Sequence, residues 1–214
     1  MPISRVLLAR HGERVDLVDN QWTLTAERPH DAPLTAVGLQ QAYKLGERLK
    51  HEGVSRIYAS PFLRTVQTAA QVASVLQMPV CIENGLCEPL LNRLFPETFA
   101  GFTHPETLAR DMPCIDPSYQ VLRRPQHPES YKEAQQRCSE VVHALARQHP
   151  GESILLVTHG LCLEYMATSL VTREGMSFSM PYCCLTECIQ DGGSSSSSST
   201  SQWHYGCKLD ASFL

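Results

Sequence analysis

Short apolar runs alternate along the chain with longer stretches in which apolar residues recur every three or four positions. The apolar runs are typical of buried strands, and four of them lie at residues 6–9, 56–60, 79–83 and 153–160. The longer stretches have one apolar face each and predict amphipathic helices between the strands. Strands alternating with helices predict a mostly parallel sheet covered on both faces, which is an α/β fold with a three-layer α/β/α sandwich.

Signals at the helix starts support two of the three predicted helices. Thr35 is well placed as an N-cap because the apolar spacing begins directly after it. Ser130 and Glu133 have the spacing of a capping box at the start of a strongly amphipathic stretch. The predicted helices cover residues 33–50, 61–77 and 128–149.

One long stretch, at about residues 84–128, breaks this rhythm. It is rich in proline and carries aromatic residues without clean periodicity, namely Phe95, Phe99, Phe102 and Tyr119. A connection of this length is usually a lid or a binding loop, so we expect a lid-like insertion in a single domain over residues 1–214. Its rings, and Trp22 in the loop after the first strand, would either stack on a bulky substrate or pack within the lid.

Two further strands are predicted near the end of the chain, at residues 184–190 and 203–209. The stretch between them, DGGSSSSSSTS at 191–201, has the composition of a flexible linker and most simply forms the loop of a hairpin. A cluster of regulatory phosphorylation sites is the other interpretation of these serines.

Composition restricts the classes of function that the chain can have. With 214 residues, 43% of them hydrophobic and 19% charged, the chain is long enough for one well-packed core. Its formal net charge of -4 argues against a general nucleic-acid binder, which carries a basic excess. No apolar run is long enough to span a bilayer, and the run before Arg10 is too short for a signal peptide. We therefore expect a cytoplasmic protein without nucleic-acid or membrane partners.

The nine cysteines include no CxxC pair. The closest group, Cys183, Cys184 and Cys188, lacks the usual spacing of zinc ligands. We therefore expect reduced thiols that are mostly buried.

Two of the predicted strands end in the same way. The first runs into His11 and Gly12, and the last of the four runs into His159 and Gly160. Because ligands of an open parallel sheet bind beyond the carboxyl ends of its strands, the two histidines are expected to face one cleft. A glycine after each histidine would let the backbone turn sharply and let a ligand come close.

Three arginines are predicted at the same edge of the sheet. Arg10 and Arg14 flank the first histidine, and Arg64 lies in the first turn of a helix, where the N-terminus favours an anion. Guanidinium groups match phosphate oxygens well, so these arginines and the two imidazoles predict a phosphate site. The alternative for a single arginine is a surface ion pair with a carboxylate such as Glu13 or Asp16.

Three motifs, in this order, resemble the histidine phosphatase superfamily, which has the phosphoglycerate mutase-like fold. They are RHGE at 10–13, SPFLRTVQT at 60–68 and THG at 158–160. Further motifs are similar to the branch that holds the phosphatase domains of the Sts (suppressor of T-cell receptor signalling) proteins and the ecdysteroid-phosphate phosphatases. These are RHGERVD, DAPLTAVG and PESY, the last at 128–131.

The resemblance implies a reaction and a role for each residue. His11 would be the nucleophile that forms a phosphohistidine intermediate, while Arg10, Arg64 and His159 would hold the phosphate oxygens. Arg14 would add a further contact to the substrate. The arginines would replace magnesium, so no cofactor and no metal are expected. A metal site built from the two histidines and a carboxylate is disfavoured because the arginines would repel a divalent cation.

Glu88, in NGLCEPLL after the third strand, matches the position of the family's general acid and base. Its leucine neighbours would favour the protonated carboxyl that donates to a leaving group, whereas the arginines would oppose it. The alternative for Glu88 is a solvated loop carboxylate, and Glu83 and Glu97 are then the other candidates for the acid.

The chain also departs from one part of the family. Glycolytic mutases typically read RHG-x-S-x-x-N, and this chain has Arg14 and Leu17 in place of the serine and the asparagine. The departure favours hydrolysis of phosphomonoesters, with phosphoglycerate mutase activity as the alternative. Aryl phosphates, including phosphotyrosine in proteins, are the first substrate class that the resemblance implies. A steroid phosphate, a sugar phosphate or another small ester is the second.

A non-catalytic, phosphate-binding scaffold on the same fold is a hypothesis from another class. Such a scaffold would lack the nucleophile or one of the arginines, and this chain has them all. Related phosphatase domains often pair, so the resemblance also leaves a homodimer open.

Overall fold

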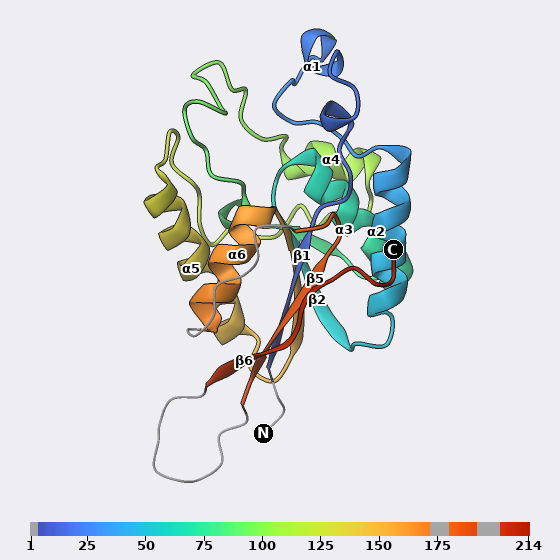
Figure 1. The fold of residues 1–214 in the computed structure, drawn as a ribbon, viewed down its shortest axis with the longest axis vertical. Helices are drawn as coiled ribbons and strands as arrows, with labels where there is room; N and C mark the ends of the chain where they lie inside the picture. The colour runs from blue at the N-terminus through green and yellow to red at the C-terminus, as the bar shows by residue number, and fades with distance from the viewer. Residues whose placement is uncertain (1–3, 172–179, 192–201) are drawn as a thin grey trace.

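A computed structural model describes residues 4–171, 180–191 and 202–214, and its centre is a six-stranded sheet with the order β3-β2-β4-β1-β5-β6 (Figure 1). The strands are β1 (Arg5–Arg10), β2 (Val54–Ala59), β3 (Val80–Ile82), β4 (Ser153–Thr158), β5 (Leu185–Gln190) and β6 (Trp203–Asp210). The first four pair in parallel, whereas β5 is antiparallel to both of its neighbours. The predicted mostly parallel sheet is thus confirmed.

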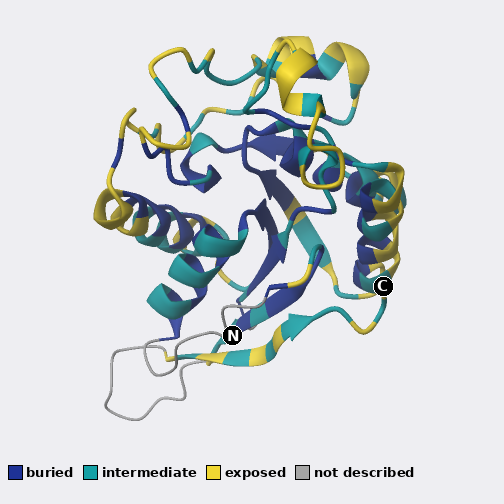
Figure 2. Ribbon diagram, turned by 45° about the horizontal axis from the view of Figure 1, so that its top comes forward, coloured by how far each residue is buried: buried dark blue, intermediate teal, exposed yellow. Residues whose placement is uncertain are grey.

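Helices cover both faces of this sheet (Figure 1). On one face lie α2 (Ala36–Leu49) and α3 (Leu63–Leu76), and on the other lie α5 (Tyr131–Gln148) and α6 (Gly160–Leu170). Leu7 of β1 packs in the cluster with α2 and α3, while Leu8 packs in the cluster with α5 and α6, as alternation along a strand requires. The central strands are accordingly buried in Figure 2. The predicted three-layer sandwich is confirmed.

The predicted helix starts are confirmed at two caps. Thr35 Oγ1 accepts a hydrogen bond of 2.9 Å from the N–H of Gly38 at the start of α2. Ser130 and Glu133 form the complete capping box of α5. Both caps use local side chains, which explains why the sequence alone predicts them.

The chain after His159 forms a helix that the apolar spacing did not predict. This helix is α6, and its sequence, GLCLEYMATSL, is apolar around most of its circumference. It packs against α5 as well as against β1 and β5. A helix covered on several sides lacks the polar face from which amphipathic helices are recognised.

Residues 84–130 contain two short helices, η2 (Asn84–Leu86) and α4 (Pro105–Asp111), and are otherwise irregular. Phe95, Phe99 and Phe102 pack on one another and on Phe62, with ring centroids 5.1 to 6.1 Å apart. Of the two interpretations of these rings, packing within the insertion is therefore the one that the structure supports.

The polar loop after β1 also contains helical turns, η1 (Val15–Leu17) and α1 (Trp22–Thr25), which lie at the top of Figure 1. At the other end of the chain, the two predicted strands are β5 and β6, paired as antiparallel neighbours. The serine-rich stretch between them, predicted as a flexible loop, lies outside the described residues.

Seven of the nine cysteines are buried and the other two are half-buried, which confirms the expected burial of the thiols. Within the described part of the chain, no helix has the length and apolar character needed to cross a membrane.

Candidate active site

The carboxyl ends of β1 and β4 bring the two histidines side by side. The strands pair in parallel with Arg10 opposite Thr158, so the next residues, His11 and His159, are neighbours at the edge of the sheet. Their ring centroids are 5.4 Å apart, and both side chains are buried. The N–H of His11 also donates to the carbonyl of Thr158 at 3.0 Å, which fixes the spacing of the two strand ends.

His11 is held as a neutral ring with one nitrogen free. Its Nδ1 lies 2.8 Å from the carbonyl oxygen of Gly12, so Nδ1 carries the proton and Nε2 keeps its lone pair. Burial lowers the pKa of His11 well below its usual value, and the positive charges of Arg64 and Arg10 lower it further. The ring therefore offers an unprotonated nitrogen at neutral pH, which is what a nucleophile needs.

The glycines after the two histidines do not serve a sharp turn, since neither Gly12 nor Gly160 has a positive φ. The expected sharp turn is therefore wrong, but one of the two positions has no room for a side chain. A Cβ atom on Gly12 would lie 2.5 Å from the carbonyl oxygen of Gly38. A Cβ atom on Gly160 would meet its nearest neighbour, Met180 Sδ, at an ordinary 3.7 Å. Gly12 is thus required by the close approach of α2.

His159 makes its hydrogen bond through Nε2, whereas His11 uses Nδ1. Its Nε2 lies 2.8 Å from Ser60 Oγ, at the carboxyl end of β2. Its Nδ1 faces Arg64 Nη2 at 3.3 Å and Glu88 Oε2 at 3.8 Å. Burial lowers the pKa of His159 well below its usual value, with Arg64 adding to the effect, so this ring is neutral as well.

Arg64 lies in the first turn of α3 and is fully buried. Its Nη2 pairs with the Glu88 carboxylate, and its guanidinium stacks over the Phe62 ring, 4.3 Å from the ring centroid. Its Nε and Nη1 are also buried and have no hydrogen-bond partner among the described residues. Unpaired buried donors are costly, so these two atoms suit an anion with several oxygens.

Glu88 is the carboxylate that contacts this cluster. Its side chain is 28% exposed and reaches both Arg64 and His159. Glu83, in contrast, is fully buried and accepts hydrogen bonds from the Tyr119 hydroxyl and from backbone N–H groups, including that of Gly85. Glu97 is exposed in the irregular segment before α4. Glu83 is therefore used to hold the backbone.

The other two arginines have protein partners. Arg10 Nη1 donates to the carbonyl of Met180, and the Arg10 guanidinium lies 4.5 Å from the centroid of the Tyr182 ring. Arg10 Nε is buried without a partner among the described residues. Arg14 donates through Nε and Nη2 to the Asp16 carboxylate, which is the ion pair considered above as the alternative. The charge of Arg14 still lowers the pKa of both histidines, so its guanidinium lies near the cluster.

Two side chains join the cluster without having been singled out from the sequence. Ser60 opens the motif SPFLRTVQT and directly follows β2, so the strand-end argument applied to the histidines would have found it. The Tyr182 ring lies 5.9 Å from that of His11. Tyr182 precedes β5, and no local pattern marks it, because its position depends on β5 lying next to β1.

The described residues contain no group of three or more histidines, cysteines or acidic residues arranged to hold a metal ion. The ring nitrogens Nδ1 of His11 and Nε2 of His159 are already engaged by Gly12 and Ser60.

The layered fold carries a buried cationic cluster at the carboxyl ends of its parallel strands, which suits an anionic ligand such as phosphate. More particularly, the chain belongs to the histidine phosphatase superfamily (branch 1), whose family pattern matches residues 6–200. Membership implies a phosphorylated substrate and the activity of a phosphatase or a mutase.

Individual relatives represent both activities. A probable phosphoglycerate mutase, GpmB, of Salmonella arizonae is 30% identical over 171 residues, which cover 78% of this chain and 74% of that protein. The human ubiquitin-associated and SH3 domain-containing protein B is 28% identical over 219 residues, which cover 82% of this chain but 32% of that protein. The crystal structure of the ecdysone phosphate phosphatase from Bombix mori, in complex with tungstate, has the same fold. Its TM-score is 0.65 at 23% identity, covering 92% of this chain and 96% of that chain.

Proposed function

We propose that the protein is a metal-independent phosphomonoester hydrolase that works through a phosphohistidine on His11. One observation carries the proposal: the free Nε2 of His11 lies in the same buried cluster as two Arg64 donors that no described acceptor satisfies. A phosphate group bound there would accept hydrogen bonds from Nε and Nη1 of Arg64 and would be open to attack by His11.

In the first step, Nε2 of His11 attacks phosphorus, the bond from phosphorus to the leaving oxygen breaks, and Glu88 gives its proton to that oxygen. The Glu88 carboxylate is paired with Arg64 before substrate binds. A phosphate dianion that takes over Arg64 repels an ionised carboxylate and favours the protonated form, which is the form that donates. The Gly12 carbonyl stabilises the positive charge that develops on the His11 ring.

In the second step, water attacks the phosphohistidine and gives its proton to the Glu88 carboxylate. The bond between phosphorus and Nε2 breaks, inorganic phosphate leaves, and the lone pair of His11 is restored. Through both steps Arg10, Arg14 and Arg64 supply the positive charge that a metal ion would give. The neutral His159 ring donates a hydrogen bond to a phosphate oxygen.

We propose aryl phosphates, including phosphotyrosine in proteins, as the substrate class. Support comes from the motifs shared with the Sts-type phosphatases and from the Tyr182 ring beside His11, which offers a flat surface to an aromatic leaving group. A steroid phosphate, a sugar phosphate or another small ester is the alternative class.

Phosphoglycerate mutase activity is the second candidate, favoured by the similarity to the probable mutase GpmB. Two positions argue against it. Leu17 is 63% exposed, and Arg14 is held by Asp16, so neither presents the small polar group found at these positions in glycolytic mutases.

Hydrolysis of para-nitrophenyl phosphate in EDTA, by the native protein and by His11→Ala, tests the proposal. We expect activity that survives the chelator and is lost in the variant. Activity that EDTA removes, or that His11→Ala retains, would contradict the mechanism. No activity in the native protein would favour the scaffold hypothesis.

The mutase alternative needs its own assay, in which 3-phosphoglycerate is followed both for release of phosphate and for formation of its 2-isomer. We expect any turnover to release phosphate. Isomer formation that exceeds hydrolysis would make the protein a mutase.

A further inference from the structure

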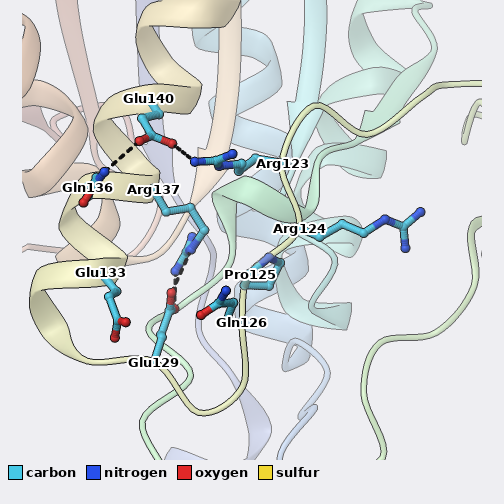
Figure 3. Close-up of a pocket in the computed structure, with 9 residues that line it drawn as sticks. All are labelled: Arg123, Arg124, Pro125, Gln126, Glu129, Glu133, Gln136, Arg137 and Glu140. Carbon is cyan, nitrogen blue, oxygen red and sulfur yellow. Dashed lines mark hydrogen bonds and ion pairs between the residues drawn. The ribbon is translucent and has the colours of Figure 1, made fainter.

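A buried ion pair, Glu129–Arg137, lies beside the segment that carries Glu88. Glu129 belongs to the PESY motif and precedes α5, and Arg137 lies on α5. Their side chains are 3% and 5% exposed, and Arg137 donates through Nε and Nη2 to both oxygens of the carboxylate. The pair lies in the wall of a cavity (Figure 3). The cavity has a volume of about 320 Å³, and no residue of the histidine cluster lines it.

The pair also binds the backbone on both sides of Glu88. Nη1 of Arg137 donates to the carbonyls of Gly85 at 2.7 Å and of Cys87 at 3.0 Å. The carbonyl of Cys87 belongs to the peptide bond that leads into Glu88. The N–H of Leu90, two residues after Glu88, donates to Oε1 of Glu129 at 3.0 Å.

This segment has one residue that is not buried. Within residues 85–91, every residue other than Glu88 is buried, and further hydrogen bonds hold their carbonyls. Thr158 Oγ1 donates to the carbonyl of Leu86 at 2.7 Å, and Cys162 Sγ donates to that of Cys87 at 3.1 Å. Glu88 is therefore presented to Arg64 from a segment whose other residues are fixed in the core.

The hydrogen bonds that the pair makes to the backbone explain its presence better than the attraction between its charges does. Replacing a buried ion pair by apolar residues of similar volume is often neutral or stabilising, so stability alone does not explain it. Apolar side chains cannot bind two carbonyls and an N–H group. A general acid must lie within hydrogen-bond reach of the leaving oxygen, and a displacement of about 1 Å can cost on the order of 10²-fold in rate.

A second ion pair in the same cavity provides a control. Arg123 and Glu140 are 54% and 39% exposed, and Glu140 also accepts a hydrogen bond from Gln136 on α5 (Figure 3). The Glu140 carboxylate makes no described hydrogen bond to residues 85–91. A substitution there changes a carboxylate of the same cavity without touching the segment that carries Glu88.

We propose that Glu129 and Arg137 are positioning residues, which fix residues 85–90 so that the Glu88 carboxyl faces the leaving oxygen of the substrate. This inference rests on the role of Glu88 as general acid in the proposed function.

The test compares two substrates that differ in their need for an acid. Phenyl phosphate has a poor leaving group, with a pKa of about 10, the value of tyrosine. Dinitrophenyl phosphate has a far more acidic leaving group, which departs without a proton. We would measure kcat/KM on both for Glu129→Gln, Arg137→Lys, Glu88→Gln and the control Glu140→Gln. Because misfolded protein lowers both rates equally, the ratio of the two does not depend on the folded fraction.

We expect Glu88→Gln to lose about 100-fold on phenyl phosphate and little on dinitrophenyl phosphate. Glu129→Gln and Arg137→Lys should lose about 10-fold on phenyl phosphate and within about two-fold on dinitrophenyl phosphate. Glu140→Gln should change neither rate.

Two results would overturn the positioning role while leaving the proposed function intact. One is an equal loss on both substrates in the Glu129 and Arg137 variants, and the other is no loss on either, each with a selective loss in Glu88→Gln. If Glu88→Gln itself shows no selective loss, the assignment of the acid fails, and the positioning role is overturned with it.

Discussion

The carboxyl ends of β1 and β4 carry the same His-Gly sequence, but their histidines are bound differently. His11 is bound at Nδ1 by the carbonyl of the next residue, which leaves Nε2 free. His159 is bound at Nε2 by Ser60, which leaves Nδ1 facing Arg64 and Glu88. Both rings are buried, and burial lowers the pKa of each well below its usual value. Charge therefore does not distinguish them, and the nitrogen that remains free does.

This difference teaches that a strand-end motif fixes where a histidine lies, whereas its hydrogen-bond partner fixes what it can do. A ring with a free Nε2 can attack phosphorus. A ring whose Nε2 accepts a hydrogen bond from a hydroxyl carries its proton on Nδ1 and can donate it to a phosphate oxygen. The predictions below test this division of roles.

The largest expected effect is the loss of the nucleophile. His11→Ala should reduce kcat for an aryl phosphate by at least about 10⁴-fold, because it removes the Nε2 that attacks phosphorus in the proposed mechanism. His159→Ala should cost about 10²- to 10³-fold, the range for removing one group that stabilises developing charge. The direct measurement is protein-bound phosphate after rapid mixing with labelled substrate and quenching in alkali, where phosphohistidine survives. Phosphorylated His11→Ala, with none in His159→Ala, would reverse the two roles.

The two glycines that follow the histidines should differ in how much stability the protein loses when each is replaced by alanine. Gly12→Ala should lower the free energy of unfolding by about 3 kcal/mol, because its Cβ would lie 2.5 Å from the backbone of Gly38. Gly160→Ala should change it by less than about 1 kcal/mol, since that Cβ has room and the position is helical. Urea denaturation of both variants measures the difference. Equal losses would show that the two strand ends are packed alike.

The same strand ends show which parts of the structure can be predicted from the sequence. The strands, the caps of α2 and α5, and the meeting of His11 with His159 could be predicted because each depends on local patterns and on the geometry of parallel strands. The helix α6 could not, because it is covered on several sides and shows no polar face. Tyr182 could not either, since it reaches His11 through the antiparallel pairing of β5 with β1.

The carboxylates show the same limit. Nothing local separates Glu88 from Glu83, five residues earlier in the chain, and only the family resemblance points to Glu88. In the structure Glu83 is buried and binds backbone N–H groups, while Glu88 pairs with Arg64. Such a distinction depends on contacts between segments that are far apart in the sequence.

A pH titration of stability should show that the two histidines are alike in charge. The folded pKa of each is lowered well below the unfolded value of about 6.5, so below pH 6.5 the unfolded chain binds protons that the folded protein does not. Their contribution is fully present above that pH and is lost as the pH falls, at about 1.4 kcal/mol per pH unit for each ring. His11→Gln and His159→Gln should each remove one such increment, as measured by urea denaturation from pH 7 to pH 5.

The native protein, titrated in parallel, gives the reference slope for both variants. If one of the two buried variants left that slope unchanged, that histidine would be protonated in the folded protein. The two rings would then differ in charge, and the free nitrogen alone would not explain their different roles.

The smallest expected effect concerns the hydroxyl that binds His159. Ser60→Ala removes the partner of Nε2, so the ring loses the bond that fixes its orientation and its tautomer. We expect kcat to fall about ten-fold or less, and the ¹⁵N shifts of His159 to report a mixture of tautomers while those of His11 stay unchanged. Ser55→Ala is the matched control, since Ser55 lies on β2, the strand that Ser60 directly follows, but binds Glu152. Full activity with an unchanged His159 spectrum would mean that Ser60 does not hold the ring, and that the two histidines differ for a reason other than the nitrogen that is bound.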